Sequence, residues 1–292
     1  MRSSMRAGGV FIVGAPRSGS SILYRTLLKH PSFSVEGDEA LQLAESAVLE
    51  ALGSAPRWKA PRPPRLWLFF LRDEEGYGRF LDEVRAITAG RESTHPEDKP
   101  PWAKEVLEVF VEHASQVRRC HRLVEKTPTH IDRAEWLLDA LPTARLLFVH
   151  RHPLDTYTSY LRRAEVDPRA TWAKLTVDEF AAMYRTHTRK AQHLAAAHPQ
   201  RFLTVGYERL THHPRQELEL ICEYLGETFS DDLLQEPSPN LERSTNDPHL
   251  FGPITAKTKE WSDFVDTAVA RLVEYKTREA ADSWGYGPLL AG

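Results

Sequence analysis

The stretch that most constrains the fold is residues 11–31, FIVGAPRSGSSILYRTLLKHP, where an apolar run leads through a glycine-containing turn into a helical pattern. In a strand–turn–helix unit of this kind, successive backbone N–H groups form a concave nest, and the start of the helix adds about half a positive charge. The stretch therefore predicts a buried strand whose carboxyl end opens onto an anion-binding loop.

The glycine spacing of this loop matches only part of the pattern GxxxxGK[ST] of nucleoside triphosphatases. Gly14 and Gly19 stand at the two glycine positions, but Ser20 occupies the place of the lysine that bridges the β- and γ-phosphates. A positive charge comes instead from Arg17, inside the loop. We therefore expect the loop to bind an anion through a different set of contacts.

An ordinary helix cap is the alternative interpretation, with Ser18 as the N-cap residue. A glycine turn, an arginine and the hydroxyls of Ser20 and Ser21 at one helix start are more than a cap requires. We favour the anion site for this reason.

Apolar, β-rich runs alternate with helical patterns along the chain. The runs are 9–14, 121–126, 144–150 and 201–207. The helical patterns are 18–29, 76–89, a segment through Leu154, Tyr157 and Leu161, 176–198, 214–226 and 260–281. Gly226 is expected to cap the end of the pattern 214–226. Buried strands alternating with amphipathic helices predict an α/β protein with a P-loop-like three-layer fold, in which helices flank a central parallel β-sheet on both faces.

A length of 292 residues is compatible with a single domain, 1–292, interrupted by a proline- and arginine-rich segment at about 53–101. That segment is either a surface excursion or a substrate-facing insertion. Its aromatic side chains, together with a nearby tryptophan, would either line an apolar pocket for a substrate or belong to the core. They are Trp67, Phe69, Phe70, Tyr77 and Trp102.

Composition excludes several classes of protein. A net charge of -3 argues against broad nucleic-acid binding. Cys120 and Cys222 lack metal-ligand spacing, which argues against a zinc site and favours reduced thiols in a cytoplasmic protein. The apolar run at 66–71 is too short to span a bilayer, so no integral membrane association is expected. Abundant alanine and arginine suit a bacterial genome of high GC content.

The run at 144–150 ends in the basic sequence His150-Arg151-His152. Nucleoside triphosphatases place a magnesium-binding carboxylate at the end of such a neighbouring strand. Basic residues at both loops suit a nucleotide that carries anionic groups at both ends and needs no metal.

Two stretches resemble one family. GAPRSGSSILYRTLLKHP (14–31) resembles the 5'-phosphosulfate loop of sulfotransferases, which use 3'-phosphoadenosine 5'-phosphosulfate (PAPS). RLLFVHRHPLDTYTSYLRR (145–163) resembles their 3'-phosphate motif, in which Ser159 lies eight positions after Arg151, and Pro153 and Asp155 match an R-x-P-x-D pattern. The likeness extends to 124–131 and 205–210, and is closer to the bacterial and tyrosylprotein-type branch than to the cytosolic aryl and steroid enzymes.

The resemblance implies a set of nucleotide contacts. Arg17 and the loop 18–21 would hold the 5'-phosphosulfate, Arg151 and Ser159 the 3'-phosphate, and Tyr207 the adenine side. The residues implied in cofactor binding are Arg17, Ser18, Gly19, Ser20, Ser21, Arg151, Ser159, Tyr207 and, in a basic loop before the last helix, Lys257.

The resemblance also implies the chemistry: a sulfuryl group moves from PAPS to a hydroxyl or amine of a small-molecule or lipid-like acceptor, PAP is released, and no metal takes part. Lys126, at a strand end, would stabilise the charge that develops during transfer, or else be a surface lysine paired with Glu125. The general base would be Glu39, Asp38 or His130. A nucleotide-dependent kinase and a non-catalytic nucleotide-binding protein are the alternatives.

Overall fold

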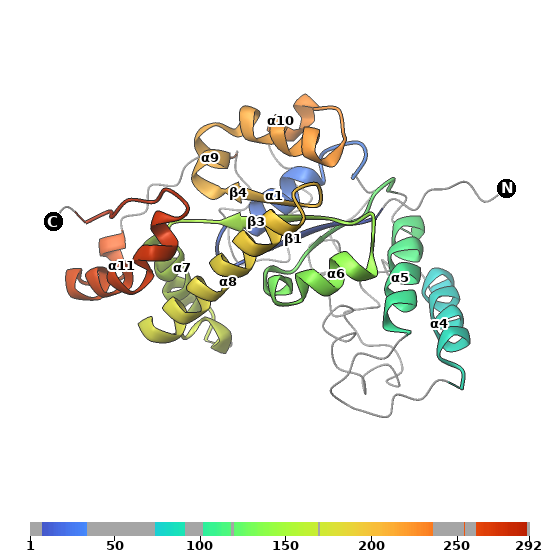
Figure 1. Cartoon of the computed structure of the whole chain (residues 1–292), viewed down its shortest axis with the longest axis horizontal. Coiled ribbons are helices and arrows are strands. Elements are labelled where there is room, and N and C mark those ends of the chain that lie inside the picture. Colours follow the sequence, from blue (N-terminus) through green and yellow to red (C-terminus); the bar gives the residue numbers. More distant parts are fainter. Residues whose placement is uncertain are drawn as a thin grey trace.

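A parallel four-stranded sheet forms the centre of the protein, as a computed structural model shows (Figure 1). The structure describes residues 8–33, 74–90, 102–117, 120–168, 170–235, 254 and 261–290. The strand order is β2-β1-β3-β4, with bounds Val124–Lys126, Val10–Gly14, Arg145–His150 and Phe202–Gly206. Every neighbouring pair is parallel. The predicted fold class is therefore confirmed.

Helices cover both faces of this sheet, which gives the three layers seen in Figure 1. On one face lie α1 (Ser20–Leu27), α9 (Tyr207–His212) and α10 (Pro214–Leu225). On the other lie α5 (Ala103–Val117), α6 (Ala134–Ala140) and α8 (Val177–Ala197), with α4 (Glu74–Thr88) outside α5. Next to α8, α7 (Pro153–Val166) and α11 (Thr267–Asp282) enclose a third apolar cluster. Short 3-10 turns cover Pro128–Arg133, Thr171–Ala173, Asp231–Leu234 and Trp261–Asp263.

The central strand β1 is apolar along its whole length because both of its faces are buried. Val10 and Ile12 belong to the cluster under α1 and α10, whereas Phe11 and Val13 belong to the cluster under α5 and α6. All four side chains are completely inaccessible to solvent. Since side chains alternate across a strand, two covered faces require a continuous apolar run, which is the pattern that the sequence shows.

Two predicted helix starts are wrong. α1 begins at Ser20 with Gly19 as its N-cap, so Ser18 is not the cap. α11 begins only at Thr267, because Asp266 caps it by accepting a hydrogen bond from the backbone N–H of Val269. Helices α5 and α6 were not predicted at all.

The described part of segment 53–101 packs against the core. α4 places Tyr77 in the main apolar cluster, and Trp102, at the start of α5, is buried there too. These two aromatics are thus core residues, whereas Trp67, Phe69 and Phe70 lie outside the described residues. Among the described helices, none is both long and apolar enough to cross a membrane.

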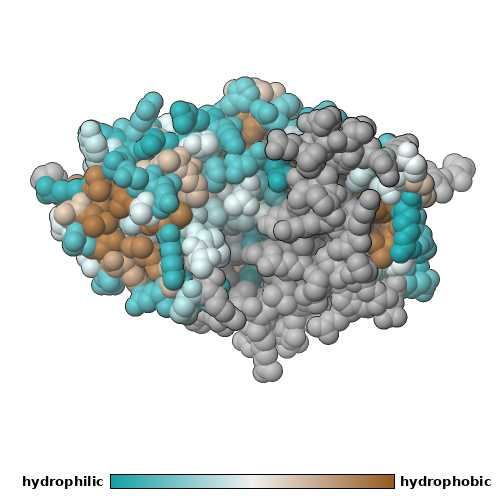
Figure 2. Space-filling model, turned by 90° about the horizontal axis from the view of Figure 1, so that it is seen from below, coloured by the Kyte–Doolittle hydropathy of each residue, from teal (hydrophilic) through white to brown (hydrophobic). Residues whose placement is uncertain are grey.

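Apolar surface gathers at the end of the molecule where α7, α8 and α11 lie. Figure 2 shows it as a brown area on the left, surrounded by hydrophilic residues. Val166 at the end of α7 and Trp172 in the following turn are half exposed, at 56% and 50%. The helices around the third cluster therefore cover their apolar side chains only in part.

Candidate nucleotide-binding site

The carboxyl ends of all four strands carry the residues that the sequence singled out. Lys126 ends β2, the loop with Arg17 follows β1, Arg151 follows β3, and Tyr207 follows β4. Because the strands are parallel, these ends lie at one edge of the sheet, the edge at which ligands of open α/β folds bind. The topology thus brings four distant stretches of sequence to one site.

The loop after β1 follows a path that only its two glycines allow. Gly14 and Gly19 have φ values of 151° and 105°. A Cβ at Gly14 would lie 2.5 Å from the carbonyl oxygen of Val149, and one at Gly19 would lie 2.3 Å from Cδ2 of Tyr207. The loop therefore lies against β3 on one side and under the tyrosine ring on the other.

Arg17 adopts an unusual backbone conformation within this loop. Its φ is 70°, and it is the one non-glycine residue of the described chain with a positive φ. A left-handed conformation costs a non-glycine residue about 1–2 kcal/mol, and such strain concentrates at functional sites. In this conformation the side chain of Arg17 leaves the loop and reaches a neighbouring element.

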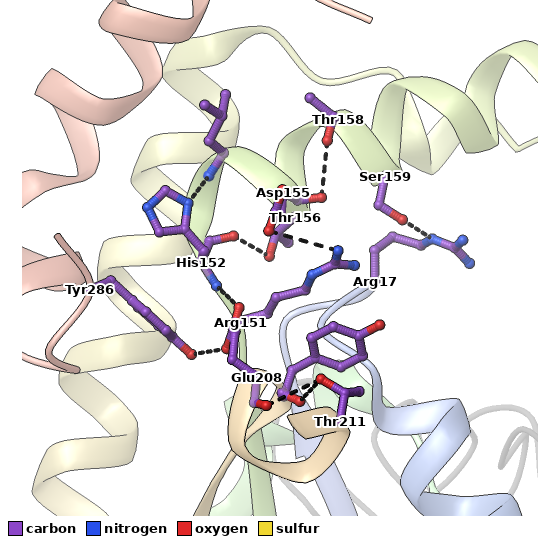
Figure 3. Close-up of polar contacts among 12 residues, drawn as sticks. Arg17, Arg151, His152, Asp155, Thr156, Thr158, Ser159, Glu208, Thr211 and Tyr286 are labelled. Carbon is purple, nitrogen blue, oxygen red and sulfur yellow. Dashed lines mark hydrogen bonds and ion pairs between the residues drawn. The ribbon is translucent and has the colours of Figure 1, made fainter. Parts of the chain in front are cut away.

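For Arg17 that element is α7. Its Nε donates a hydrogen bond of 3.1 Å to Oγ of Ser159 (Figure 3). The two motifs that resemble the 5'- and 3'-phosphate sites are therefore in direct contact.

Ser18 contributes a hydroxyl to the inside of the loop. It is 1% exposed, and its Oγ finds no hydrogen-bond partner among the described residues. The backbone N–H groups of Ser20 and Ser21, in the first turn of α1, likewise have no acceptor in the described part of the chain. Backbone N–H groups without acceptors at a helix start suit an anion, and here a buried hydroxyl lies in the same loop.

Two side chains hold Arg151. Its guanidinium lies over the ring of Tyr207, 4.3 Å from the ring centre, and 3.9 Å from a carboxylate oxygen of Asp155. Its Nε is buried and has no hydrogen-bond partner among the residues that the structure describes. A buried donor without an acceptor is costly, so this nitrogen marks a place where a ligand oxygen would be favourable.

Lys126 is buried, with only 9% of its surface exposed. Register pairs it with Ile12, and side chains alternate along β2, so Lys126 and Glu125 point to opposite faces of the sheet. The alternative of a surface lysine paired with Glu125 is therefore wrong.

Glu125 instead contacts the base candidate His130. The Nδ1 of His130 lies 3.4 Å from a Glu125 oxygen, and Thr127 donates to the other oxygen at 2.7 Å. His130 is 2% exposed, in the 3-10 turn that follows β2. The other base candidates, Glu39 and Asp38, lie outside the described residues, as does Lys257, which was predicted to bind the cofactor.

The sequence missed a set of side chains behind Arg151. Glu208 accepts hydrogen bonds from the backbone N–H of His152 at 2.9 Å and from the hydroxyl of Tyr286 at 2.6 Å. The Nδ1 of His150 contacts the same hydroxyl at 2.8 Å. Burial, with a smaller contribution from the positive charge of Arg209, lowers the pKa of His150 to about 4. Tyr286 follows the last helix, where no local pattern signals a partner for β3.

A family model described as "Sulfotransferase family" matches residues 9–231, well over half of the chain. The chain belongs to the sulfotransferase family. Solved sulfotransferases share its fold over nearly its whole length. The sulfotransferase domain of the olefin synthase of Synechococcus PCC 7002 is 22% identical, with a TM-score of 0.55, and the match covers 96% of this chain and 95% of that one.

Two further solved sulfotransferases show the same likeness. The sulfotransferase domain from the curacin biosynthetic pathway is 19% identical, with a TM-score of 0.51 and coverage of 96% and 98%. Sulfotransferase STF9 from Mycobacterium avium is 14% identical, with a TM-score of 0.52 and coverage of 96% and 77%. At these identities the likeness shows the fold, and the residue roles in this sulfotransferase depend on its own site.

Proposed function

We propose that this sulfotransferase takes a sulfuryl group from PAPS and transfers it to a hydroxyl or amine of a small-molecule or lipid-like acceptor. The observation that carries the proposal is a pair of buried polar atoms, Oγ of Ser18 and Nε of Arg151, neither of which has a partner among the described residues. Leaving such atoms without partners costs about 1–3 kcal/mol each. A ligand with oxygen acceptors at both places would remove that cost.

The 5'-phosphosulfate fits the loop after β1. The backbone N–H groups of Ser20 and Ser21, the hydroxyl of Ser18 and the start of α1 all favour an anion there. Gly19 belongs to the same turn and lets the backbone pass under the Tyr207 ring.

The 3'-phosphate fits the region around Arg151. An arginine presents a planar fork of donors, which suits bidentate contact with a phosphate, and the Tyr207 ring packs against the guanidinium. The hydroxyl of Ser159 accepts a hydrogen bond from Arg17. On ligand binding, contacts of these two side chains with the phosphates would replace that hydrogen bond. Lys257 completes the proposed set from outside the described residues.

In the proposed transfer, the acceptor oxygen or nitrogen forms a bond to sulfur while the bond between sulfur and the 5'-phosphate oxygen breaks. The electron pair of the broken bond stays on the phosphate of PAP, where Arg17 and Lys126 would stabilise the developing charge. The acceptor proton passes to a base, and no metal is needed to balance the step. Burial of Lys126 strengthens this electrostatic contribution, because charges interact more strongly away from water.

The base is proposed among Glu39, Asp38 and His130. Comparing the pH dependence of kcat/KM for Glu39→Gln, Asp38→Asn and His130→Gln separates them. Loss of the base removes the acidic limb of the profile and lowers kcat by about 10²–10⁴-fold. A variant that keeps both the rate and the acidic limb is not missing the base.

The donor is tested by ligand-induced stabilisation. Thermal unfolding of the full chain is followed with PAP, with AMP and with ATP plus magnesium. A ligand at 100 times its dissociation constant adds about 2.7 kcal/mol to the free energy of unfolding. We expect PAP to stabilise most. Stabilisation by ATP–magnesium alone would refute the proposed donor and favour a kinase.

We also propose that 1–292 forms one domain in which segment 53–101 faces the acceptor. Replacing Trp67, Phe69 and Phe70 by alanine should then raise KM for the acceptor and leave the dissociation constant of PAP unchanged. Equal losses for both ligands would contradict the proposed role of the segment.

A further inference from the structure

The peptide group between Arg151 and His152 is clamped from two helices. Its carbonyl oxygen accepts a hydrogen bond of 3.0 Å from the hydroxyl of Tyr184, on α8. Its N–H donates a hydrogen bond of 2.9 Å to Glu208, on α9. The peptide lies beyond the end of β3, where sheet pairing no longer fixes it. Side chains therefore set its orientation.

The second oxygen of Glu208 connects this clamp to the segment after α11. It lies 2.6 Å from the hydroxyl of Tyr286, and a carboxylate can only accept, so Tyr286 is the donor. The Tyr286 oxygen then has only lone pairs left for Nδ1 of His150, 2.8 Å away. His150 must therefore carry its proton on Nδ1. Figure 3 shows Tyr286 and the backbone of His152 on the two oxygens of Glu208.

Aromatic packing fixes the same segment against β3. The ring of Trp284 stacks on His150, with centres 4.3 Å apart and planes 12° apart. Its indole N–H donates to Thr188 of α8 at 3.1 Å. His152 also contacts the segment, because its Nε2 lies 3.1 Å from the carbonyl oxygen of Gly287. The end of the chain thus forms part of the support behind Arg151.

We propose that Glu208 and Tyr286 are positioning residues for Arg151, an inference that rests on the proposed binding of a 3'-phosphate by that arginine. Glu208 holds the peptide that follows Arg151, while the preceding residue, Tyr207, supports the guanidinium from below. Tyr286 holds the carboxylate of Glu208 in place. Neither residue needs to touch the nucleotide, so their effect should be confined to ligands that carry a 3'-phosphate.

The test compares two nucleotides that differ only in that phosphate. Isothermal titration calorimetry on the full chain gives the dissociation constants of PAP and AMP, and their ratio measures the contribution of the 3'-phosphate. Tyr286→Phe should lower the preference for PAP about tenfold, the effect of losing one partly buried hydrogen bond to a carboxylate, and leave AMP binding within about twofold.

A matched control lies at the other end of β3. The hydroxyl of Tyr224 donates to the carbonyl oxygen of Leu146 at 3.2 Å, so Tyr224→Phe also removes one tyrosine hydrogen bond to this strand region. We expect Tyr224→Phe to keep the full preference for PAP. If both variants lose it equally, the effect is general destabilisation and the inference is wrong.

Glu208→Gln provides a second, spectroscopic test. The amide oxygen can still accept from the N–H of His152, but the amide N–H₂ must then donate to Tyr286. Tyr286 would turn its own proton to Nδ1 of His150, which forces the proton of the imidazole onto Nε2. The ¹⁵N shifts of the His150 ring should report this change of tautomer, and much of the preference for PAP should return relative to Glu208→Ala. An unchanged tautomer would overturn the proposed chain of hydrogen bonds.

The proposed function and the inference fail in different ways. A parent protein that binds PAP and AMP equally refutes the role of Arg151, and the inference falls with it. A parent that prefers PAP, with a Tyr286→Phe variant that keeps the whole preference, refutes the inference alone.

Discussion

Replacing Gly19 by alanine should destabilise the protein and weaken nucleotide binding at the same time. The added Cβ would lie 2.3 Å from Cδ2 and 3.0 Å from Cε2 of Tyr207, and the φ of 105° is one that alanine rarely adopts. Relief of the clash requires the ring to move by about 1 Å to reach ordinary contact. That ring supports the guanidinium of Arg151 at 4.3 Å, so the displacement reaches the proposed 3'-phosphate region.

The two costs can be estimated separately. The left-handed backbone of Gly19 costs a residue with a Cβ about 1–2 kcal/mol, and overpacking against a buried ring costs about 1–3 kcal/mol. The free energy of unfolding should thus fall by about 2–5 kcal/mol, a large part of the 5–15 kcal/mol typical of a domain. The Tm should fall by roughly 5–15 °C, and the dissociation constant of PAP should rise at least about tenfold.

A double-mutant cycle with Tyr207→Ala isolates the clash. Urea unfolding of Gly19→Ala, Tyr207→Ala and the double variant should give a coupling of at least about 1 kcal/mol, because alanine at 207 removes the atoms that the new Cβ meets. Gly78→Ala is the control: nothing lies within 4 Å of a Cβ there, and alanine in a helix is favourable by about 0.5–1 kcal/mol. Strictly additive losses in the cycle would refute the packing of Tyr207 on the loop.

Three other substitutions or conditions test the site. Ser18→Ala should raise the free energy of unfolding by about 1 kcal/mol, because it removes a buried hydroxyl without a partner, yet weaken PAP binding about tenfold; denaturation and calorimetry measure the two effects. Arg151→Lys should lower the preference for PAP over AMP by at least about tenfold in the same titrations, since lysine lacks the planar fork that stacks on the ring of Tyr207. His150 is held neutral, with its pKa lowered to about 4, so the stability that it contributes is complete above pH 6.5 and lost as the pH falls toward 4. Urea titrations should show a loss of about 2 kcal/mol between pH 7 and pH 5, and His150→Phe should reduce the pH dependence.

The strands and most long helices could be predicted because their signals are local. The run 144–150 becomes β3 (Arg145–His150), and the pattern 176–198 becomes α8 (Val177–Ala197). The glycine predicted to end α10 does so, since Gly226 adopts a φ of 71°. In each case the period of the apolar residues or a single glycine decides the structure without help from distant residues.

The missed features depend on partners far away in the sequence. Arg17 and Ser159 are 142 positions apart, and only the parallel crossover from β1 to β3 brings them into contact. Tyr286 meets Glu208 through the return of the chain after α11. Helix α5 is a different case, because Val106, Phe110 and Ala114 recur at helical spacing and carried a signal that was overlooked.

The serine at position 20 now has a structural explanation. Ser20 is 3% exposed, at the first position of α1, so the fold itself fills the space around its side chain. A lysine there would have to bury its ammonium group or open the loop, and burial of an unpaired charge is costly. The loop carries its positive charge on Arg17 instead. Arg17 has a left-handed backbone, and its side chain donates a hydrogen bond to Ser159 on α7. A lysine at position 20 would contact the consecutive phosphates of a triphosphate. Arg17 instead connects the loop after β1 to the motif after β3. This geometry favours a ligand whose anionic groups lie at two separate places, which is the chemical distinction between a 3',5'-substituted nucleotide and a triphosphate.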